Sequence, residues 1–177
     1  MKATINLEKN HFPVLLKELI SIISPLYGGT FIDCTLGQGG YSKEILKTKS
    51  NKVIALDRDP DVEQIAKKIE HQNKNRFNFF NNKFSEIDKL NIDHTDLKAV
   101  IFDLGYSLNQ ILNLKKGLSF KSTGKLDMRL GLNQFSCDDV ISNISEKSLN
   151  KIFKIFGEEK NSKLIARRII QNRNKNK

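Results

Sequence analysis

The chain has few cysteines, few prolines and no tryptophan, and it lacks any long apolar run. Its 177 residues include two cysteines and three prolines. Cys34 and Cys137 are too few and too far apart for a disulfide framework, and with three scattered histidines they predict no metal site. The sequence contains no run of about eighteen apolar residues, so no membrane span is predicted. The first residues also lack the apolar stretch of a secretory signal. We therefore expect a cytoplasmic protein with enough chain for one ordinary domain.

Acidic residues are missing from the last part of the chain. The net charge is +10, and no Asp or Glu follows Glu159. The basic residues that do follow include Arg167, Arg168 and Arg173, which are candidate RNA-binding residues. A basic block of this kind is typical of proteins that bind polyanions, most often nucleic acids. The alternative is a solvated helix face followed by a polar tail.

A glycine-rich turn separates two apolar runs. Residues 30–35 predict a strand, the turn Gly37-Gln38-Gly39-Gly40 follows, and a helical stretch begins at Ser42. A second apolar run over residues 53–57 ends at Asp57, twenty residues after Gly37. This layout is typical of a nucleotide-type cofactor site, in which the glycines let a ligand approach the backbone. The acid at the end of the second strand is placed to accept hydrogen bonds from two ribose hydroxyls.

The sequence of the same turn indicates which kind of cofactor would bind. Ser42 occupies the position of the third glycine in the dinucleotide pattern G-x-G-x-x-G. That glycine allows close helix packing beside a pyrophosphate, so its absence weakens the case for a nicotinamide cofactor. S-adenosylmethionine has a ribose and no pyrophosphate, and it is the better candidate. A glycine turn that serves folding alone is the alternative.

Strands and helices alternate through the first two thirds of the chain. Strands are predicted over residues 30–35, 53–57, 76–80 and 97–104, with helical stretches before and between them. This alternation predicts a parallel α/β sheet with right-handed crossovers. Four strands are few for a doubly wound fold, and the strand over 97–104 would be an exposed edge. We therefore expect that the chain is incomplete or that a partner covers this edge.

Seven stretches occur in a characteristic order over about His11 to Arg173. They are His11–Glu18, Asp33–Ser42, Leu56–Pro60, Asp103–Gln110, Gly117–Phe120, Leu126–Arg129 and Phe156–Glu159. Together they resemble the ribosomal RNA small subunit methyltransferase H family, also called MraW. The resemblance implies S-adenosylmethionine-dependent methylation of N4 of a cytidine in the decoding region of small-subunit rRNA. The partner would be that rRNA or the assembled small ribosomal subunit.

The resemblance also implies how the chain is organised. Residues 1–114 would form the N-terminal part of an S-adenosylmethionine-dependent methyltransferase domain, which is a partial doubly wound, Rossmann-like sheet. Residues 115–177 would begin a helical insertion that recognises the substrate. Three helices are predicted there, near 138–144, 148–156 and 158–173. The C-terminal strands of the catalytic fold would be absent.

The resemblance assigns site residues one by one. Asp103 and Tyr106 are the candidate catalytic residues, since a carboxylate can polarise an N–H bond and an aromatic ring can stack on an unstacked base. Tyr41 stands where the family usually has histidine, and Leu108-Asn109 stands where it usually has Ser-Pro. A non-enzymatic RNA- or cofactor-binding remnant and a nicotinamide-dependent oxidoreductase are the rival interpretations. The predicted cofactor contacts are Gly39, Gly40, Tyr41, Asp57, Phe84, Asp103 and Gln110.

Overall fold

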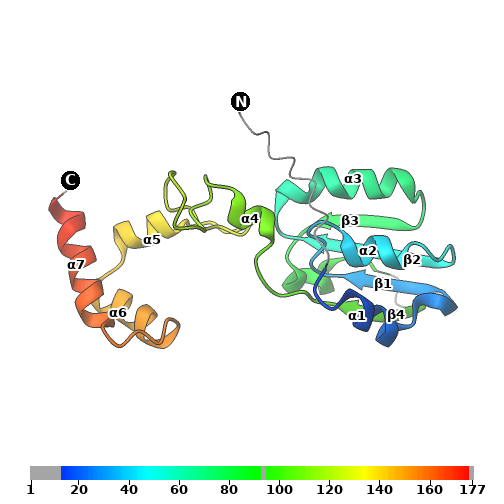
Figure 1. Ribbon diagram of the computed structural model, residues 1–177, viewed down its shortest axis with the longest axis horizontal. Coiled ribbons are helices and arrows are strands. Elements are labelled where there is room, and N and C mark those ends of the chain that lie inside the picture. Colours follow the sequence, from blue (N-terminus) through cyan, green and yellow to red (C-terminus); the bar gives the residue numbers. More distant parts are fainter. Residues whose placement is uncertain (1–12, 93–94, 176–177) are drawn as a thin grey trace, which may run out of the picture. The chain divides into compact units, whose positions relative to one another are not determined.

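The computed structural model describes residues 13–92 and 95–175 (Figure 1). The chain divides into two compact units. The first unit contains the described residues up to Leu108 together with Leu130–Leu132. The second unit contains Asn109–Arg129 and the described residues from Asn133 onward. The predicted functional division between residues 114 and 115 stays a prediction.

The first unit is built on a four-stranded parallel sheet with the strand order β3-β2-β1-β4. The chain runs outward from β1 to β3 and then returns to pair β4 with β1. The order of strands therefore reverses between β1 and β4, which is where open α/β sheets bind ligands. The predicted α/β sheet is confirmed. The strands are β1 (Gly29–Asp33), β2 (Asn51–Asp57), β3 (Phe77–Asn81) and β4 (Leu97–Ile101).

Helices cover one face of this sheet. α1 (Leu16–Ile23), α2 (Gly40–Ile45) and α3 (Glu63–Gln72) pack their apolar side chains against Phe31, Val53 and Phe77. The short helices η1 (Pro25–Tyr27) and η2 (Pro60–Val62) precede β1 and α3. The first crossovers pass over this face, as right-handed β-α-β connections require. The helices fix the positions of the loops that follow β1 and β2.

A second, smaller hydrophobic cluster lies on the opposite face of the sheet. There the short helix η3 (Phe84–Lys89) and the segment after it pack on the sheet through Ile87, Leu90 and Ile92. Ile32, Cys34 and Leu56 supply the buried side chains beneath them. The side chains of β1 and β2 are thus buried on both faces, which explains why these two strands appear as continuous apolar runs in the sequence.

β4 forms one edge of the sheet, as the sequence predicted. Val100 is 42% exposed and Lys98 is also exposed, whereas Ile101 is buried. The strand ends at Ile101 and not at Leu104, so the predicted end was wrong. The last ladder bond runs from the backbone N of Cys34 to the carbonyl of Ile101 (2.9 Å). The backbone N of Asp103 then donates to the Thr35 hydroxyl (2.8 Å), which takes the chain out of the ladder.

The second unit is helical in the part of the chain that the structure describes. Its helices are α4 (Leu108–Leu112), α5 (Cys137–Asn143), α6 (Glu146–Ile155) and α7 (Ser162–Lys175). The sequence did not predict α4, which begins at the last residue of the first unit. α6 and α7 pack against each other, and Leu149 and Ala166 are buried. No described helix is both long enough and apolar enough to cross a membrane.

Candidate cofactor site and basic helix

Three carboxylates gather at the carboxyl ends of the parallel strands. Asp33 ends β1, Asp57 ends β2, and Asp103 follows β4. Asp33 is fully buried, and it accepts hydrogen bonds from the Ser42 hydroxyl (2.6 Å) and from the backbone N of Thr35 (3.2 Å). Burial raises the pKa of Asp33 to about 6 against the effect of these bonds, and the charges of Asp57 and Asp103 add to the increase. This edge of the sheet therefore suits a ligand that carries positive charge.

No group of three potential metal ligands forms among the described residues. The three carboxylates therefore do not make a cation cage here.

Asp57 fastens the glycine turn to the second strand. One carboxylate oxygen accepts the backbone N–H of Gly37 (2.8 Å), and the other accepts that of Asp59 (2.9 Å). Burial raises the pKa of Asp57, while these backbone bonds lower it. A backbone hydrogen bond from Arg58 also lowers the pKa, so three of the about four acceptor positions of the carboxylate are in use. A ribose hydroxyl would use the remaining position.

The protein's own packing requires glycine at two of the predicted cofactor contacts. Gly39 has φ +72°, and a Cβ there would lie 2.5 Å from Cδ1 of Ile69. A Cβ on Gly40 would overlap the ring of Pro13. Close approach of a ligand is therefore not needed to explain either glycine. Cofactor contact at both residues stays a prediction.

The Tyr41 side chain reaches across the unit to the end of β4. Its ring is buried, and its hydroxyl donates to the carbonyl of Val14 (2.6 Å) and lies 3.4 Å from Oδ2 of Asp103. Burial, followed by the charge and the hydrogen bond of Asp103, raises the pKa of Tyr41 to about 12. The hydroxyl therefore stays protonated and serves as a donor at neutral pH.

Aromatic rings lie exposed near the same edge. Phe84 of η3 contacts Phe102 edge to face, with ring centroids 5.4 Å apart and an interplanar angle of 83°. Phe84 is 38% exposed, so one face can still receive an apolar ligand such as adenine. Phe102 could not be recognised as a site residue from the sequence, because it belongs to an apolar run and gives no signal of its own. Tyr106 is also exposed.

Gln110 belongs to a different unit from the other predicted cofactor contacts. It lies on α4, in the second unit, whereas the other six belong to the first unit. Its cofactor contact stays a prediction.

A short segment inside the predicted insertion belongs to the first unit. The backbone N of Leu132 donates to the carbonyl of Arg58 (3.1 Å), directly after Asp57. Gly131 has φ +91°, and a Cβ there would overlap the same carbonyl. The glycine at position 131 was visible in the sequence, but only the structure assigns it to the loop that follows β2.

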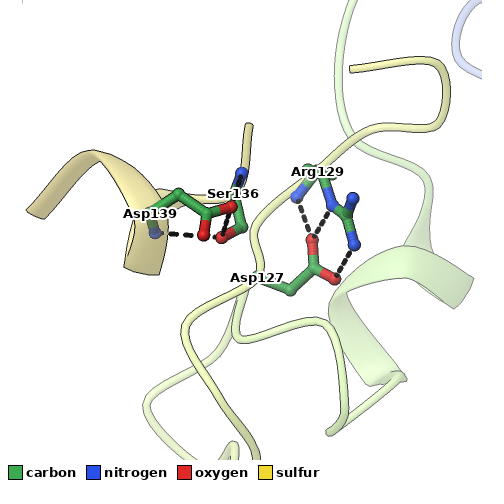
Figure 2. Close-up of polar contacts among 4 residues, drawn as sticks. All are labelled: Asp127, Arg129, Ser136 and Asp139. Carbon is green, nitrogen blue, oxygen red and sulfur yellow. Dashed lines mark hydrogen bonds and ion pairs between the residues drawn. The ribbon is translucent and has the colours of Figure 1, made fainter. Parts of the chain in front are cut away.

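The Leu126–Arg129 motif builds a loop in the second unit (Figure 2). The Arg129 guanidinium donates to both oxygens of Asp127 (Nε 2.7 Å, Nη2 2.9 Å), and its backbone N donates to one of them (3.1 Å). These bonds from Arg129 hold the pKa of Asp127 below its usual range. Ser136 and Asp139 form a capping box at the start of α5. Local folding therefore explains this motif.

The three candidate RNA-binding arginines, Arg167, Arg168 and Arg173, all lie on α7 but differ in their surroundings. Arg173 is half-buried and donates to the carbonyls of Ile141 (2.6 Å) and Ile144 (3.0 Å), so it caps the end of α5. Arg167 is exposed and lies 3.7 Å from a carboxylate oxygen of Glu146. Arg168 is exposed on α7. Of the three, Arg173 is the least suited to a phosphate contact.

The MraW methylase family matches this chain over residues 8–177. The chain belongs to this family. Similar relatives, each named ribosomal RNA small subunit methyltransferase H, come from Ehrlichia ruminantium (strain Gardel), Orientia tsutsugamushi (strain Ikeda) and Zymomonas mobilis. They are 39%, 40% and 39% identical over 170, 165 and 163 residues. The matches cover 94%, 93% and 90% of this chain and 56%, 53% and 49% of the relatives.

These comparisons confirm the family that the ordered motifs predicted. The chain spans about half the length of the curated relatives that it matches. The sheet described above is consistent with a Rossmann-like methyltransferase fold.

Proposed function

We propose that the first unit binds S-adenosylmethionine and that the chain acts in the methylation of small-subunit rRNA. The main support is the convergence of Asp33, Asp57 and Asp103 at the strand ends of a chain that belongs to the MraW methylase family. The relatives carry the name ribosomal RNA small subunit methyltransferase H. A reaction on rRNA agrees with a cytoplasmic location.

The residues at this edge fit the cofactor's chemistry. Asp57 retains an acceptor position for the ribose, and Phe84 offers a partly exposed ring for adenine. The negative charge of the three strand ends attracts a sulfonium and an ammonium group. S-adenosylmethionine supplies a methyl group on a positively charged sulfur.

The target atom in this proposal is N4 of a cytidine in the decoding region. The lone pair of that amine is delocalised into the ring, so the amine is a poor nucleophile. Holding N4 in line with the methyl group is then the main task, because orientation removes much of the entropic barrier. Asp103 accepts a hydrogen bond from the N4 amine, and this polarises the N–H bond and increases the electron density on the nitrogen. Tyr106, which is exposed, stacks against the base after it leaves its helix.

The second unit contacts the rRNA in this proposal. Arg167 and Arg168 are exposed on α7, and no acid follows Glu159 in the chain. Each phosphate that such residues neutralise releases counterions, so binding weakens as the salt concentration rises. Replacing Arg167 and Arg168 with Gln should flatten the salt dependence of rRNA binding. An unchanged dependence would identify α7 as an ordinary solvated helix.

Calorimetry tests the cofactor assignment directly. S-adenosylmethionine and NADH are titrated separately into the purified chain under the same conditions. The proposal expects saturable binding of S-adenosylmethionine at one site and no comparable binding of NADH. Binding of NADH alone would instead support the nicotinamide-dependent oxidoreductase.

A cofactor-binding remnant without activity is the second candidate. It is favoured by the open edge at β4, where Val100 and Phe102 are 42% and 50% exposed next to Asp103. We expect little or no turnover from this chain alone, because unpaired strand edges and exposed apolar side chains favour self-association. The assay follows labelled methyl groups into small ribosomal subunits and identifies the modified nucleoside by mass spectrometry. Efficient formation of N4-methylcytidine would support the enzyme over the remnant.

A further inference from the structure

The hydroxyl of Tyr41 joins three segments that are far apart in the sequence. Tyr41 lies on α2, directly after the glycine turn. Its hydroxyl is 2.6 Å from the carbonyl of Val14, before α1, and 3.4 Å from Oδ2 of Asp103, after β4. The ring itself is 5% exposed and is part of the main core. The hydroxyl is therefore held rigidly at the point where these segments meet.

A phenol has one proton to donate, and here two acceptors compete for it. The shorter contact makes the Val14 carbonyl the main acceptor, and the Asp103 contact is at the long end of hydrogen-bonding range. Asp103 carries an exposed side chain, but its backbone N is fixed by the Thr35 hydroxyl (2.8 Å). The Tyr41 contact thus restrains the carboxylate, whereas Thr35 restrains the main chain.

We propose that Tyr41 is a positioning residue, whose hydroxyl orients the Asp103 carboxylate for the ligand bound at this edge. The inference rests on the proposed binding of S-adenosylmethionine. An exposed carboxylate samples several rotamers, and a fixed donor beside it reduces the freedom that is lost when a ligand binds. In this role the side chain of Tyr41 acts through Asp103.

A double-mutant cycle separates this role from simple support of the fold. The variants are Tyr41→Phe, Asp103→Ala and the double variant, and calorimetry measures the affinity of each for S-adenosylmethionine. Tyr41→Phe keeps the buried ring and removes only the hydroxyl. We expect it to weaken binding about threefold to tenfold in the wild-type background and less than about twofold in the Asp103→Ala background. Tyr27→Phe, at an 89% exposed tyrosine on η1, is the matched control and should not change the affinity.

If Tyr41→Phe weakens binding by the same factor in the wild-type and Asp103→Ala backgrounds, the inference is overturned, because Tyr41 would then act through Val14 and the fold alone. An unchanged affinity in the wild-type background would also overturn it.

A measurement without ligand tests the contact between Tyr41 and Asp103 separately from the proposed function. Urea unfolding of the four proteins measures whether Tyr41 and Asp103 are coupled without cofactor. If the wild type binds no S-adenosylmethionine, the proposed function fails. Additive shifts of the unfolding midpoints would then overturn the contact as well, whereas non-additive shifts would support it.

Discussion

Replacing Asp57 with alanine should remove the protein's ability to recognise the ribose of the proposed cofactor, S-adenosylmethionine. Asp57 accepts backbone hydrogen bonds from Gly37, Asp59 and Arg58, which leaves one of its about four acceptor positions for a ribose hydroxyl. A hydrogen bond to a charged group contributes about 1.5–3 kcal/mol. Because Asp57 is only partly buried, we expect the lower figure, which is about a tenfold loss of affinity.

The difficulty is that Asp57→Ala also releases the backbone N–H of Gly37 and loosens the turn. A change on the ligand separates the two effects. S-adenosylhomocysteine and its 2′-deoxy analogue are each titrated into the wild type and the variant by calorimetry. The wild type should prefer the ribose form about tenfold, and Asp57→Ala should show almost no preference.

The two ligands serve as controls for each other, since both depend equally on the rest of the turn. If Asp57→Ala weakens both ligands but keeps the full preference for the ribose form, Asp57 supports the turn and does not contact the ribose. That result would refute the assignment of Asp57 to the cofactor. An unchanged affinity for both ligands would refute it too.

Three further changes test the electrostatics and the edge of the fold. The folded pKa of Asp33, about 6, lies above the unfolded value of about 3.9, so its stabilising contribution is full below about pH 4 and is lost as the pH rises through 6. Asp33→Asn should therefore raise the free energy of unfolding by up to about 3 kcal/mol near pH 7.5 and hardly change it near pH 4; equal urea midpoint shifts at both pH values would contradict this. Arg173→Met should destabilise α5 and its packing by about 1–3 kcal/mol, whereas Arg168→Met should change thermal stability by less than about 0.5 kcal/mol; equal losses would show that the caps on Ile141 and Ile144 contribute nothing. Val100→Lys, on the exposed edge strand, should reduce aggregation measured by light scattering, and an unchanged rate would mean that another surface drives association.

The parallel sheet and its faces could be predicted from the sequence. Strands buried on both sides, such as β1 and β2, must be almost continuously apolar, and a helix between them forces the parallel arrangement. The exposed edge followed from the number of strands. The end of β4 could not be predicted, because it depends on a hydrogen bond to Thr35, which is distant in the sequence.

The candidate site was only partly predictable. Asp57 and Asp103 were recognised because each ends an apolar run, and such positions meet at one edge of a parallel sheet. Asp33 also ends a strand, but nothing in the sequence shows that its carboxylate is fully buried against Ser42. Glycines at positions 39 and 40 suggested a ligand, whereas the structure gives them packing partners in Ile69 and Pro13.

By itself the sequence determined the family, the order of the strands along the chain and the acids at their ends. Those features depend on residue types and on local spacing, which the chain carries without folding. Only the tertiary structure decided which donor each side chain meets. Arg173 became a helix cap and Tyr41 became a neighbour of Asp103, because hydrogen bonds form between groups that folding brings within about 3 Å.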